Sequence, residues 1–141
     1  MSSFTSPLRT EDTDRFRDDT GRPVYILLEP FTYEVGALGS GDVVRVPAKF
    51  ETDFGSIPRA FWWLEPPRGR AGKAAVVHDW LYASKLRNRT EADKIFLEAL
   101  GVLGVPYVTR QAMYRAVRAG GAGGYGRPEE YALAMQLLAN A

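Results

Sequence analysis

Residues 74–82 read Ala-Ala-Val-Val-His-Asp-Trp-Leu-Tyr, and this stretch decides how the rest of the chain is arranged. The pattern is helical from about residue 72 to residue 86, and the two alanines at the start of the stretch are small enough to let another helix pack closely. His78 is the only histidine in the sequence and stands directly beside Asp79. Tyr82 lies one helical turn further on, so the three side chains occupy adjoining faces of one helix.

The segments on either side of this helix predict an α+β fold. Upstream, residues 23–29, 31–35 and 42–46 have the composition and alternation of strands. Downstream, helical patterns run from about residue 91 to residue 103 and from Pro106 onward. We therefore expect a small N-terminal antiparallel β-meander packed on a three-helix core, plus a C-terminal helix.

The composition along the chain predicts one globular domain with an extension at each end. Residues 1–20 are polar and charged and are predicted to form an extended N-terminal arm, whereas residues 21–119 form a single globular domain. Residues 120–127 form a glycine-rich linker that lacks the Lys-Ser/Thr pair of a phosphate-binding loop. Residues 128–141 begin with proline, which suits the first position of a helix, and they predict a C-terminal helix.

The overall composition excludes several classes of protein. At 141 residues and 45% hydrophobic, the chain is long enough to form a real core. A net charge of +1 does not indicate nucleic-acid binding, because no field of a single sign builds up. The absence of cysteine excludes disulfides and zinc–thiolate sites. No stretch resembles a signal peptide or a transmembrane segment, so we expect synthesis in a cytoplasm.

The histidine stretch suits acid–base chemistry, and it also has a purely structural interpretation. Neutral imidazole is the best-matched general base near pH 7, and a carboxylate on its far nitrogen would fix its tautomer. Asp93, on the returning helix, is the candidate for that role. Alternatively, His78 and Tyr82 are hydrogen-bonded core residues. Asp93 would then satisfy a main-chain N–H in a Thr90-x-x-Asp93 capping box.

A polar loop upstream of this helix offers further ligands. Asp53 is a candidate second carboxylate for a cation, and calcium or magnesium suits such carboxylates better than zinc does. Ser56 and Arg59 are candidates for binding substrate, Arg59 through a bidentate contact with a phosphate. The alternative is that Asp and Ser are ordinary turn formers in a proline-bounded loop.

Four groups of residues along the chain form specific motifs. They are Phe50-x-Thr52-Asp53-Phe54-x-Ser56-Ile57-Pro58-Arg59, Ala75-x-x-His78-Asp79-x-Leu81-Tyr82, Arg89-x-x-Ala92-Asp93-x-x-Phe96 and Met113-Tyr114-x-Ala116-Val117-Arg118. This set resembles family 1353 of the domains of unknown function (DUF1353), and the resemblance covers about residues 22–119. The family is common in tailed phages and prophages, so the resemblance implies a phage or phage-like origin without an established activity.

The helix that carries His78-Asp79-x-x-Tyr82 also resembles the core of phospholipase A(2), in the disulfide-free form carried in parvovirus capsids. The resemblance implies that His78 is the general base and that Asp79 binds calcium. Asp93 would then orient the histidine, and Tyr82 would support Asp93. That family has a calcium loop upstream, whose main-chain carbonyls complete the metal shell, which implies a metal-binding role for Gly55.

These observations leave three functions to consider. The first is a phage-encoded, virion- or tail-associated protein with a phospholipase-A(2)-like site for calcium-dependent hydrolysis of an ester in phospholipid or another envelope substrate. The second is a non-catalytic structural protein of a phage particle, whose arm and tail helix contact other structural proteins. The third is a metal hydrolase that acts on the cell wall. We expect synthesis in the cytoplasm of the bacterial host and incorporation into the phage particle.

Overall fold

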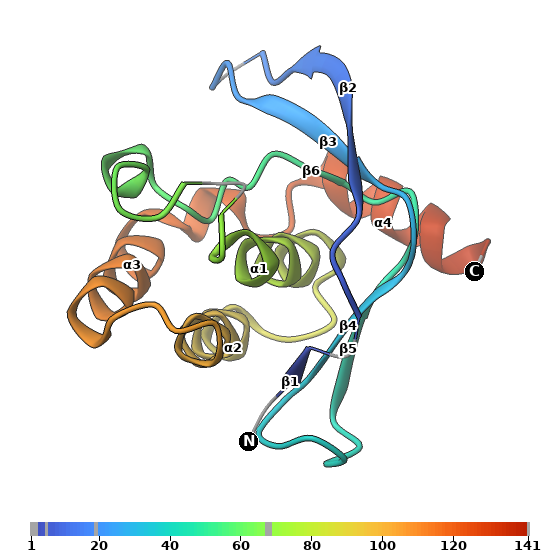
Figure 1. Ribbon diagram of the computed structural model, residues 1–141. Helices are drawn as coiled ribbons and strands as arrows, with labels where there is room; N and C mark the ends of the chain where they lie inside the picture. The colour runs from blue at the N-terminus through green and yellow to red at the C-terminus, as the bar shows by residue number, and fades with distance from the viewer. Residues whose placement is uncertain (1–2, 5, 19, 67–68, 141) are drawn as a thin grey trace.

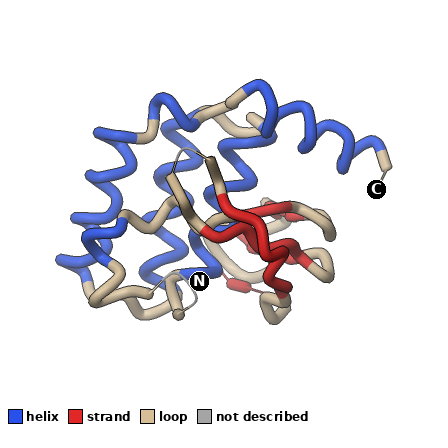
Figure 2. The backbone as a smooth tube through the Cα atoms, turned by 90° about the horizontal axis from the view of Figure 1, so that it is seen from above, coloured by secondary structure: helices blue, strands red, loops and turns tan. Residues whose placement is uncertain are grey.

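The computed structural model describes residues 3–4, 6–18, 20–66 and 69–140, and within them the strands precede the helices along the chain (Figure 1). This part of the chain contains β1 (Ser3–Phe4), β2 (Thr10–Phe16), β3 (Pro23–Leu27), β4 (Phe31–Glu34), β5 (Val43–Val46), β6 (Glu51–Thr52), η1 (Arg59–Phe61), α1 (Gly72–Ser84), α2 (Arg89–Val102), α3 (Tyr107–Gly120), η2 (Ala122–Gly124) and α4 (Pro128–Ala139). Figure 2 shows the strands gathered on one side of the helices. The α+β class is confirmed.

The strands form two small antiparallel sheets rather than a single meander. One sheet has the order β1-β4-β5 and the other the order β2-β3-β6, so the consecutive strands β3 and β4 belong to different sheets. In the first sheet Phe31 pairs with Val46 and Tyr33 pairs with Val44, and all four side chains are buried. This period of two directs one face of the sheet into the core.

Helix α1 is the centre of the fold. All of its residues except Lys73 and Asp79 are buried. A helix that is buried on nearly every side must be covered by neighbouring elements. Strands β5 and β6 and helices α2 and α4 contact it, and Figure 1 shows α1 between the strands and α2. Ala74 and Ala75 are fully buried, and their small side chains allow neighbouring elements to approach closely.

Helix α2 begins with a cap that differs from the predicted one. Asn88 is the N-cap, and its side chain accepts a hydrogen bond from the Glu91 N–H at 2.8 Å and donates one to the Glu91 carboxylate at 2.9 Å. Asn88 therefore caps the helix through its side-chain oxygen, and its side-chain amide also holds the Glu91 carboxylate. The Thr90-x-x-Asp93 capping box is wrong, because Thr90 lies inside the helix and Asp93 is fully buried in the interior.

The predicted N-terminal arm contains a strand that belongs to the globular fold. Residues 10–16 form β2, which pairs with β3 so that Glu11 lies opposite Ile26. The side chains of β2 are mostly exposed, so the strand is held chiefly by its main-chain pairing. Residues 1, 2, 5 and 19 of the predicted arm lie outside the described residues.

The glycine-rich segment that was predicted as a linker lies against α1. The N–H of Gly126 donates to the Tyr82 carbonyl at 2.8 Å, and the rings of Tyr125 and Tyr82 meet edge to face at 5.3 Å. A Cβ atom on Gly121 would stand 2.7 Å from the Tyr82 hydroxyl. Glycine therefore permits the close approach of the main chain to this tyrosine.

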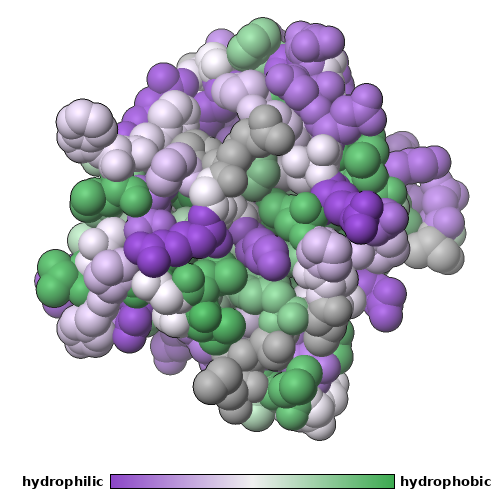
Figure 3. All heavy atoms as spheres, viewed as in Figure 1, coloured by the Kyte–Doolittle hydropathy of each residue, from purple (hydrophilic) through white to green (hydrophobic). Residues whose placement is uncertain are grey.

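The predicted C-terminal helix is α4, which contacts α1; residue 141 lies outside the described residues. On the face seen in Figure 3, hydrophobic residues form small separate groups among hydrophilic ones. In the described part of the chain, no helix combines the length and the apolar character needed to cross a membrane.

Replacing Gly121 by alanine should lower the free energy of unfolding by about 1–3 kcal/mol, because the added methyl group would clash with the Val117 carbonyl and the Tyr82 hydroxyl. Gly123→Ala is the matched control, since a Cβ atom there meets nothing within 4 Å. Its free energy of unfolding should change by about 1 kcal/mol or less. Urea denaturation measures both values, and equal values would show that the segment does not pack on Tyr82.

Candidate active site

His78 stands between two oxygen-bearing side chains in the interior. Its Nε2 lies 2.6 Å from Asp93 Oδ1, and its Nδ1 lies 2.5 Å from Ser56 Oγ. Only 2% of His78 and none of Asp93 is exposed. The imidazole comes from α1, the carboxylate from α2, and the hydroxyl from the loop between β6 and η1. The fold therefore brings together three residues that lie far apart in the sequence.

Asp93 is held by three donors. Besides His78, the Tyr82 hydroxyl donates to Oδ1 at 2.6 Å and Arg118 donates to Oδ2 at 2.7 Å. Burial alone would raise the pKa of Asp93, but the hydrogen bonds from its three donors outweigh burial and lower the pKa below its usual value. Asp93 is therefore an anion at neutral pH and needs a proton on His78 Nε2. Nδ1 is left as an acceptor that faces Ser56.

Two arginines that sequence reasoning did not assign to the site support this arrangement. The helical pattern of α3 places Arg118 away from the face formed by Met113 and Val117, yet its guanidinium reaches Asp93. Arg89 donates from Nε to the Tyr82 hydroxyl at 3.3 Å and from a terminal nitrogen to the Val117 carbonyl at 3.0 Å. In the sequence, the only feature that pointed to Arg89 and Arg118 was their position in the DUF1353-like motifs.

The loop that carries Ser56 has a constrained main chain. Phe54 is buried and has a φ of 54°, in the left-handed region that bulky residues seldom adopt. The Thr52 hydroxyl accepts a hydrogen bond from the Phe54 N–H at 3.1 Å, and the Asp53 carboxylate accepts one from the Gly55 N–H at 2.8 Å. Strain of this kind concentrates at functional sites, where the surroundings hold the main chain in place.

Asp79 approaches the same serine hydroxyl from another side. Its Oδ1 lies 2.5 Å from Ser56 Oγ, and its Oδ2 accepts a hydrogen bond from the Thr52 hydroxyl at 2.6 Å. Burial, followed by the charge of Asp53, raises the pKa of Asp79 to about 7, although both hydroxyl contacts act in the opposite direction. A large fraction of Asp79 is therefore protonated at neutral pH.

These contacts require one proton more than the neutral serine and imidazole provide. Three hydrogen bonds join four side chains in series: Asp79, Ser56, His78 and Asp93. Each bond needs one hydrogen atom, whereas a serine hydroxyl and a neutral imidazole supply two. Burial lowers the pKa of His78 and raises that of Asp79, so protonated Asp79 is the form that supplies the third hydrogen. In that form Asp79 donates to Ser56 and Ser56 donates to His78, whereas ionised Asp79 accepts from the Ser56 hydroxyl.

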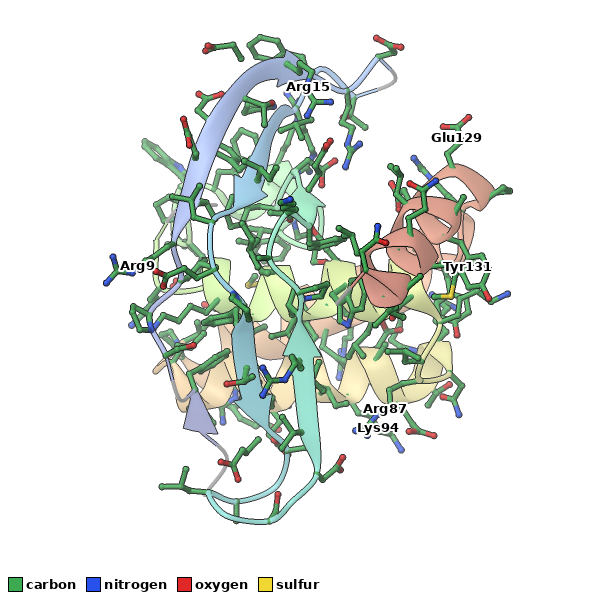
Figure 4. All side chains as sticks on the ribbon, turned by 90° about the vertical axis from the view of Figure 1, so that its right-hand side faces the viewer. Arg9, Arg15, Arg87, Lys94, Glu129 and Tyr131 are labelled. Carbon is green, nitrogen blue, oxygen red and sulfur yellow. The ribbon has the colours of Figure 1, made fainter. Side chains whose placement is uncertain are left out.

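The hydrogen-bonded series reaches a cavity of about 530 Å³, a size typical of ligand sites. Ser56, His78, Asp79 and Tyr82 line this cavity. β6 and its flanking residues form one wall, and α4 forms the other. In Figure 4, α4 stands across from the strands, and its labelled residues Glu129 and Tyr131 point away from them. Ser56 and His78 thus lie at the inner wall of the cavity, where they are almost fully buried.

The carboxylates expected to bind calcium are engaged by protein donors. Asp53 turns toward its own loop, where Oδ1 accepts from the Gly55 N–H and Oδ2 lies 3.4 Å from Arg17. Both oxygens of Asp79 are in contact with hydroxyl groups. Within residues 3–4, 6–18, 20–66 and 69–140, no group of three or more His, Cys, Asp or Glu side chains could hold a metal ion.

The two residues expected to bind substrate are separated by the fold. Ser56 lines the cavity and contacts His78. Arg59 donates to the Thr20 carbonyl at 2.6 Å, and its guanidinium lies 5.2 Å from the centre of the Trp62 ring. Arg59 is not among the described residues that line the cavity. Its contacts therefore fasten the loop after Ser56 to the β2–β3 turn.

Residues 25–117 match a protein family described as "Protein of unknown function (DUF1353)". The matched range contains the hydrogen-bonded series and ends one residue before Arg118. An uncharacterized protein of Sinorhizobium fredii, y4jT, is 31% identical over 118 residues. The aligned region covers 82% of this chain and 34% of y4jT, so the chain spans about a third of the length of this relative. No solved structure gives a significant match.

Asp79→Asn should raise the free energy of unfolding at pH 8 by about 1–3 kcal/mol. The pKa of Asp79 is about 7 in the folded protein and 3.8 ordinarily, so the wild type loses stability as the pH rises through this window. Below pH 3.8 Asp79 is protonated in both the folded and the unfolded protein, so the wild type and Asp79→Asn no longer differ in stability through this charge. Urea denaturation near pH 4 and pH 8 measures the effect, and an equal difference at both pH values would contradict a raised pKa.

Proposed function

The chain belongs to the family of unknown function DUF1353, and we propose that this member hydrolyses an ester or amide bond, with Ser56 as the nucleophile and His78 as the general base. The observation that carries the proposal is the contact between Ser56 Oγ and His78 Nδ1 at the wall of the cavity, with Asp93 behind the imidazole. A hydroxyl, an imidazole and a carboxylate in series can activate a serine on many unrelated folds. Geometry, rather than sequence order, identifies the roles.

The reaction proceeds in two stages that share one base. First, Nδ1 of His78 takes the proton of Ser56 while Oγ bonds to the substrate carbonyl carbon. When the tetrahedral intermediate collapses, the bond to the leaving group breaks, and the imidazolium returns the proton to that group. Second, water gives a proton to Nδ1 and attacks the acyl–serine ester, and the released oxygen of Ser56 recovers the proton. Asp93 stays ionised and stabilises the imidazolium.

Tyr82 and Arg118 act as positioning residues in this scheme. Tyr82 shares Oδ1 of Asp93 with the imidazole, and burial together with this hydrogen bond raises the pKa of Tyr82, so the phenol remains a donor. Arg118 holds the second carboxylate oxygen. The two donors prevent the carboxylate from rotating away from His78. Neither reaches the reacting atoms.

The phospholipase-A(2)-like alternative uses the same base with water as the nucleophile. It remains a proposal, supported by the His-Asp-x-x-Tyr pattern and by the Tyr82–Asp93–His78 contacts. We favour Ser56 over water as the nucleophile because the Ser56 hydroxyl itself occupies the position beside His78 Nδ1. No step is assigned to calcium, because the carboxylate oxygens of Asp53 and Asp79 are engaged by protein donors.

We further propose that the protein is encoded by a phage and is associated with the virion or tail. The support is the occurrence of the DUF1353 family in tailed phages and prophages. The substrate would then be a component of the bacterial envelope, in the phospholipid or cell-wall class. Other structural proteins of the particle would be its partners.

A structural role in such a particle is the second candidate, and the burial of the polar cluster favours it. Asp93 joins α2 to His78 on α1 and to Arg118 on α3. These contacts would fix three helices without any chemistry. Reactivity of Ser56 distinguishes the two candidates.

A fluorophosphonate probe should form a covalent adduct on Ser56 of the wild type. Ser56→Ala should abolish the adduct, and His78→Gln should slow its formation by about a thousandfold or more, because the base is lost. Ser84→Ala is the matched control, since Ser84 is buried in α1 and does not belong to the described lining of the cavity. Intact-mass and peptide-mapping measurements follow the adduct. A wild type that does not react would eliminate the serine mechanism.

The rate of this labelling should depend on pH in a bell-shaped manner. His78 must be neutral, and burial lowers its pKa below 6.5, so the acid limb lies below that value. Asp79 must be protonated for Ser56 to donate to His78, and its pKa of about 7 sets the alkaline limb. Asp79→Asn keeps a donor at every pH and should remove the alkaline limb. An unchanged profile in that variant would contradict the assigned hydrogen bonds.

A further inference from the structure

The cavity follows the edge of a strand. Both residues of β6, Glu51 and Thr52, line it, together with the flanking residues 49, 50 and 53. Consecutive side chains of a strand point to opposite faces of the sheet, so a cavity that meets both residues of β6 lies at the edge of the sheet and not on one face. The cavity therefore runs along the main chain of β6, at the border of the β2-β3-β6 sheet.

The main chain of Glu51 faces this border. On β3, the N–H of Leu27 donates to the Phe50 carbonyl at 2.9 Å, and its carbonyl accepts from Lys49 at 2.8 Å. Neighbouring residues of a strand direct their main-chain groups to opposite sides, so Ile26 faces β2. Glu51 lies opposite Ile26, and its N–H and C=O consequently point away from β3. Among the described strands, β6 pairs with β3 alone.

The opposite wall of the cavity is one face of α4. Its lining residues recur at the three- and four-residue spacing of a helix face: Arg127, Glu130, Leu133, Gln136, Leu137 and Asn140. Leu133 is 52% exposed, so an apolar side chain in the cavity is left about half uncovered. A ligand that packed on this leucine would bury it.

The charges along the cavity nearly cancel. The lining contains four basic side chains, Arg17, Arg22, Lys49 and Arg127, and four acidic ones, Glu51, Asp53, Asp79 and Glu130, of which Asp79 is protonated in large part at neutral pH. A strongly charged ligand would meet no strong field of opposite sign. Mixed charges, amides and leucines beside a strand edge suit a polypeptide, whose main chain is neutral and whose side chains vary.

We propose that the groove between β6 and α4 binds a polypeptide segment in extended conformation, which adds to β6 as a strand and packs a side chain on Leu133. Main-chain hydrogen bonds supply affinity in this mode of recognition, and pockets for alternate side chains supply specificity. Cleavage of the segment rests on the proposed function, whereas its binding does not. In cleavage, the acyl half is transferred to Ser56, the amine half leaves with the proton from His78, and water releases the new carboxyl terminus.

Binding is measured on the Ser56→Ala protein by fluorescence anisotropy of a fluorescein-labelled library of unstructured octapeptides. Glu51→Pro, added to this protein, removes the outward N–H without removing a bond to β3, and an edge strand tolerates proline in such a position. Glu51→Ala is the comparator, because it lacks the same side chain and keeps the N–H. The octapeptides should bind the proline variant about three- to tenfold more weakly than the alanine variant.

A second pair of variants tests the helical wall independently. Leu133→Ser removes the apolar contact, whereas Leu138→Ser changes a leucine that is 39% exposed and is not among the residues of the described cavity wall. Octapeptides should bind Leu133→Ser about tenfold more weakly than Leu138→Ser, as expected for the loss of one buried leucine contact. Thermal unfolding confirms that all four variants are folded.

Equal octapeptide affinities of Glu51→Pro and Glu51→Ala, or of Leu133→Ser and Leu138→Ser, would overturn the proposal that the groove binds a polypeptide. Absence of octapeptide binding would also overturn it, and binding of decanoate or phosphatidylcholine vesicles would then identify an acyl ligand instead. Octapeptide binding with both expected losses, in a protein whose Ser56 does not react with the fluorophosphonate, would support the groove and overturn the hydrolase proposal alone. The peptide-binding proposal and the hydrolase proposal can therefore be contradicted independently of each other.

Discussion

The hydrogen bond between His78 and Asp93 is the interaction on which the rest of the structure depends. An unpaired carboxylate in the core would be severely destabilising, so α1 and α2 must stay in the register that joins these groups. Arg118 adds a charged donor from α3 and ties the third helix to the same carboxylate. The small residues Ala74 and Ala75 make the close packing around α1 sterically feasible. One carboxylate, that of Asp93, thus links three helices through two polar contacts inside an apolar core.

The same bond determines what the other side of the imidazole can do. With Nε2 committed to Asp93, Nδ1 of His78 acts as an acceptor, and Ser56 is placed to donate to it. Asp79 competes for that hydroxyl when it is ionised and supports it when it is protonated. An ionisable group retained where its charge is unfavourable is typical of a site in which stability is given up for function. The cavity beside it gives such a site access to a ligand.

Periodicity was enough to predict the α+β class and the approximate limits of the helices. It did not reveal β2, because an exposed strand held by main-chain pairing needs no apolar alternation. The contact between Ser56 and His78 could not be predicted, since the path of the loop depends on the left-handed main chain of Phe54. Asp93 was correctly placed on the returning helix, but its capping interpretation was wrong because Asn88 takes that role. Helical spacing also does not predict that the long side chain of Arg118 on α3 reaches Asp93.

Nitrogen-15 NMR of the imidazole tests the central claim most directly, and the presence of a single histidine in the sequence makes its signals unambiguous. The account predicts a ring that is neutral at pH 7, protonated at Nε2 and unprotonated at Nδ1, with a pKa below 6.5 because of its burial. A neutral ring protonated at Nδ1, or a pKa at or above the ordinary value, would contradict the series of hydrogen bonds from which the proposed chemistry follows.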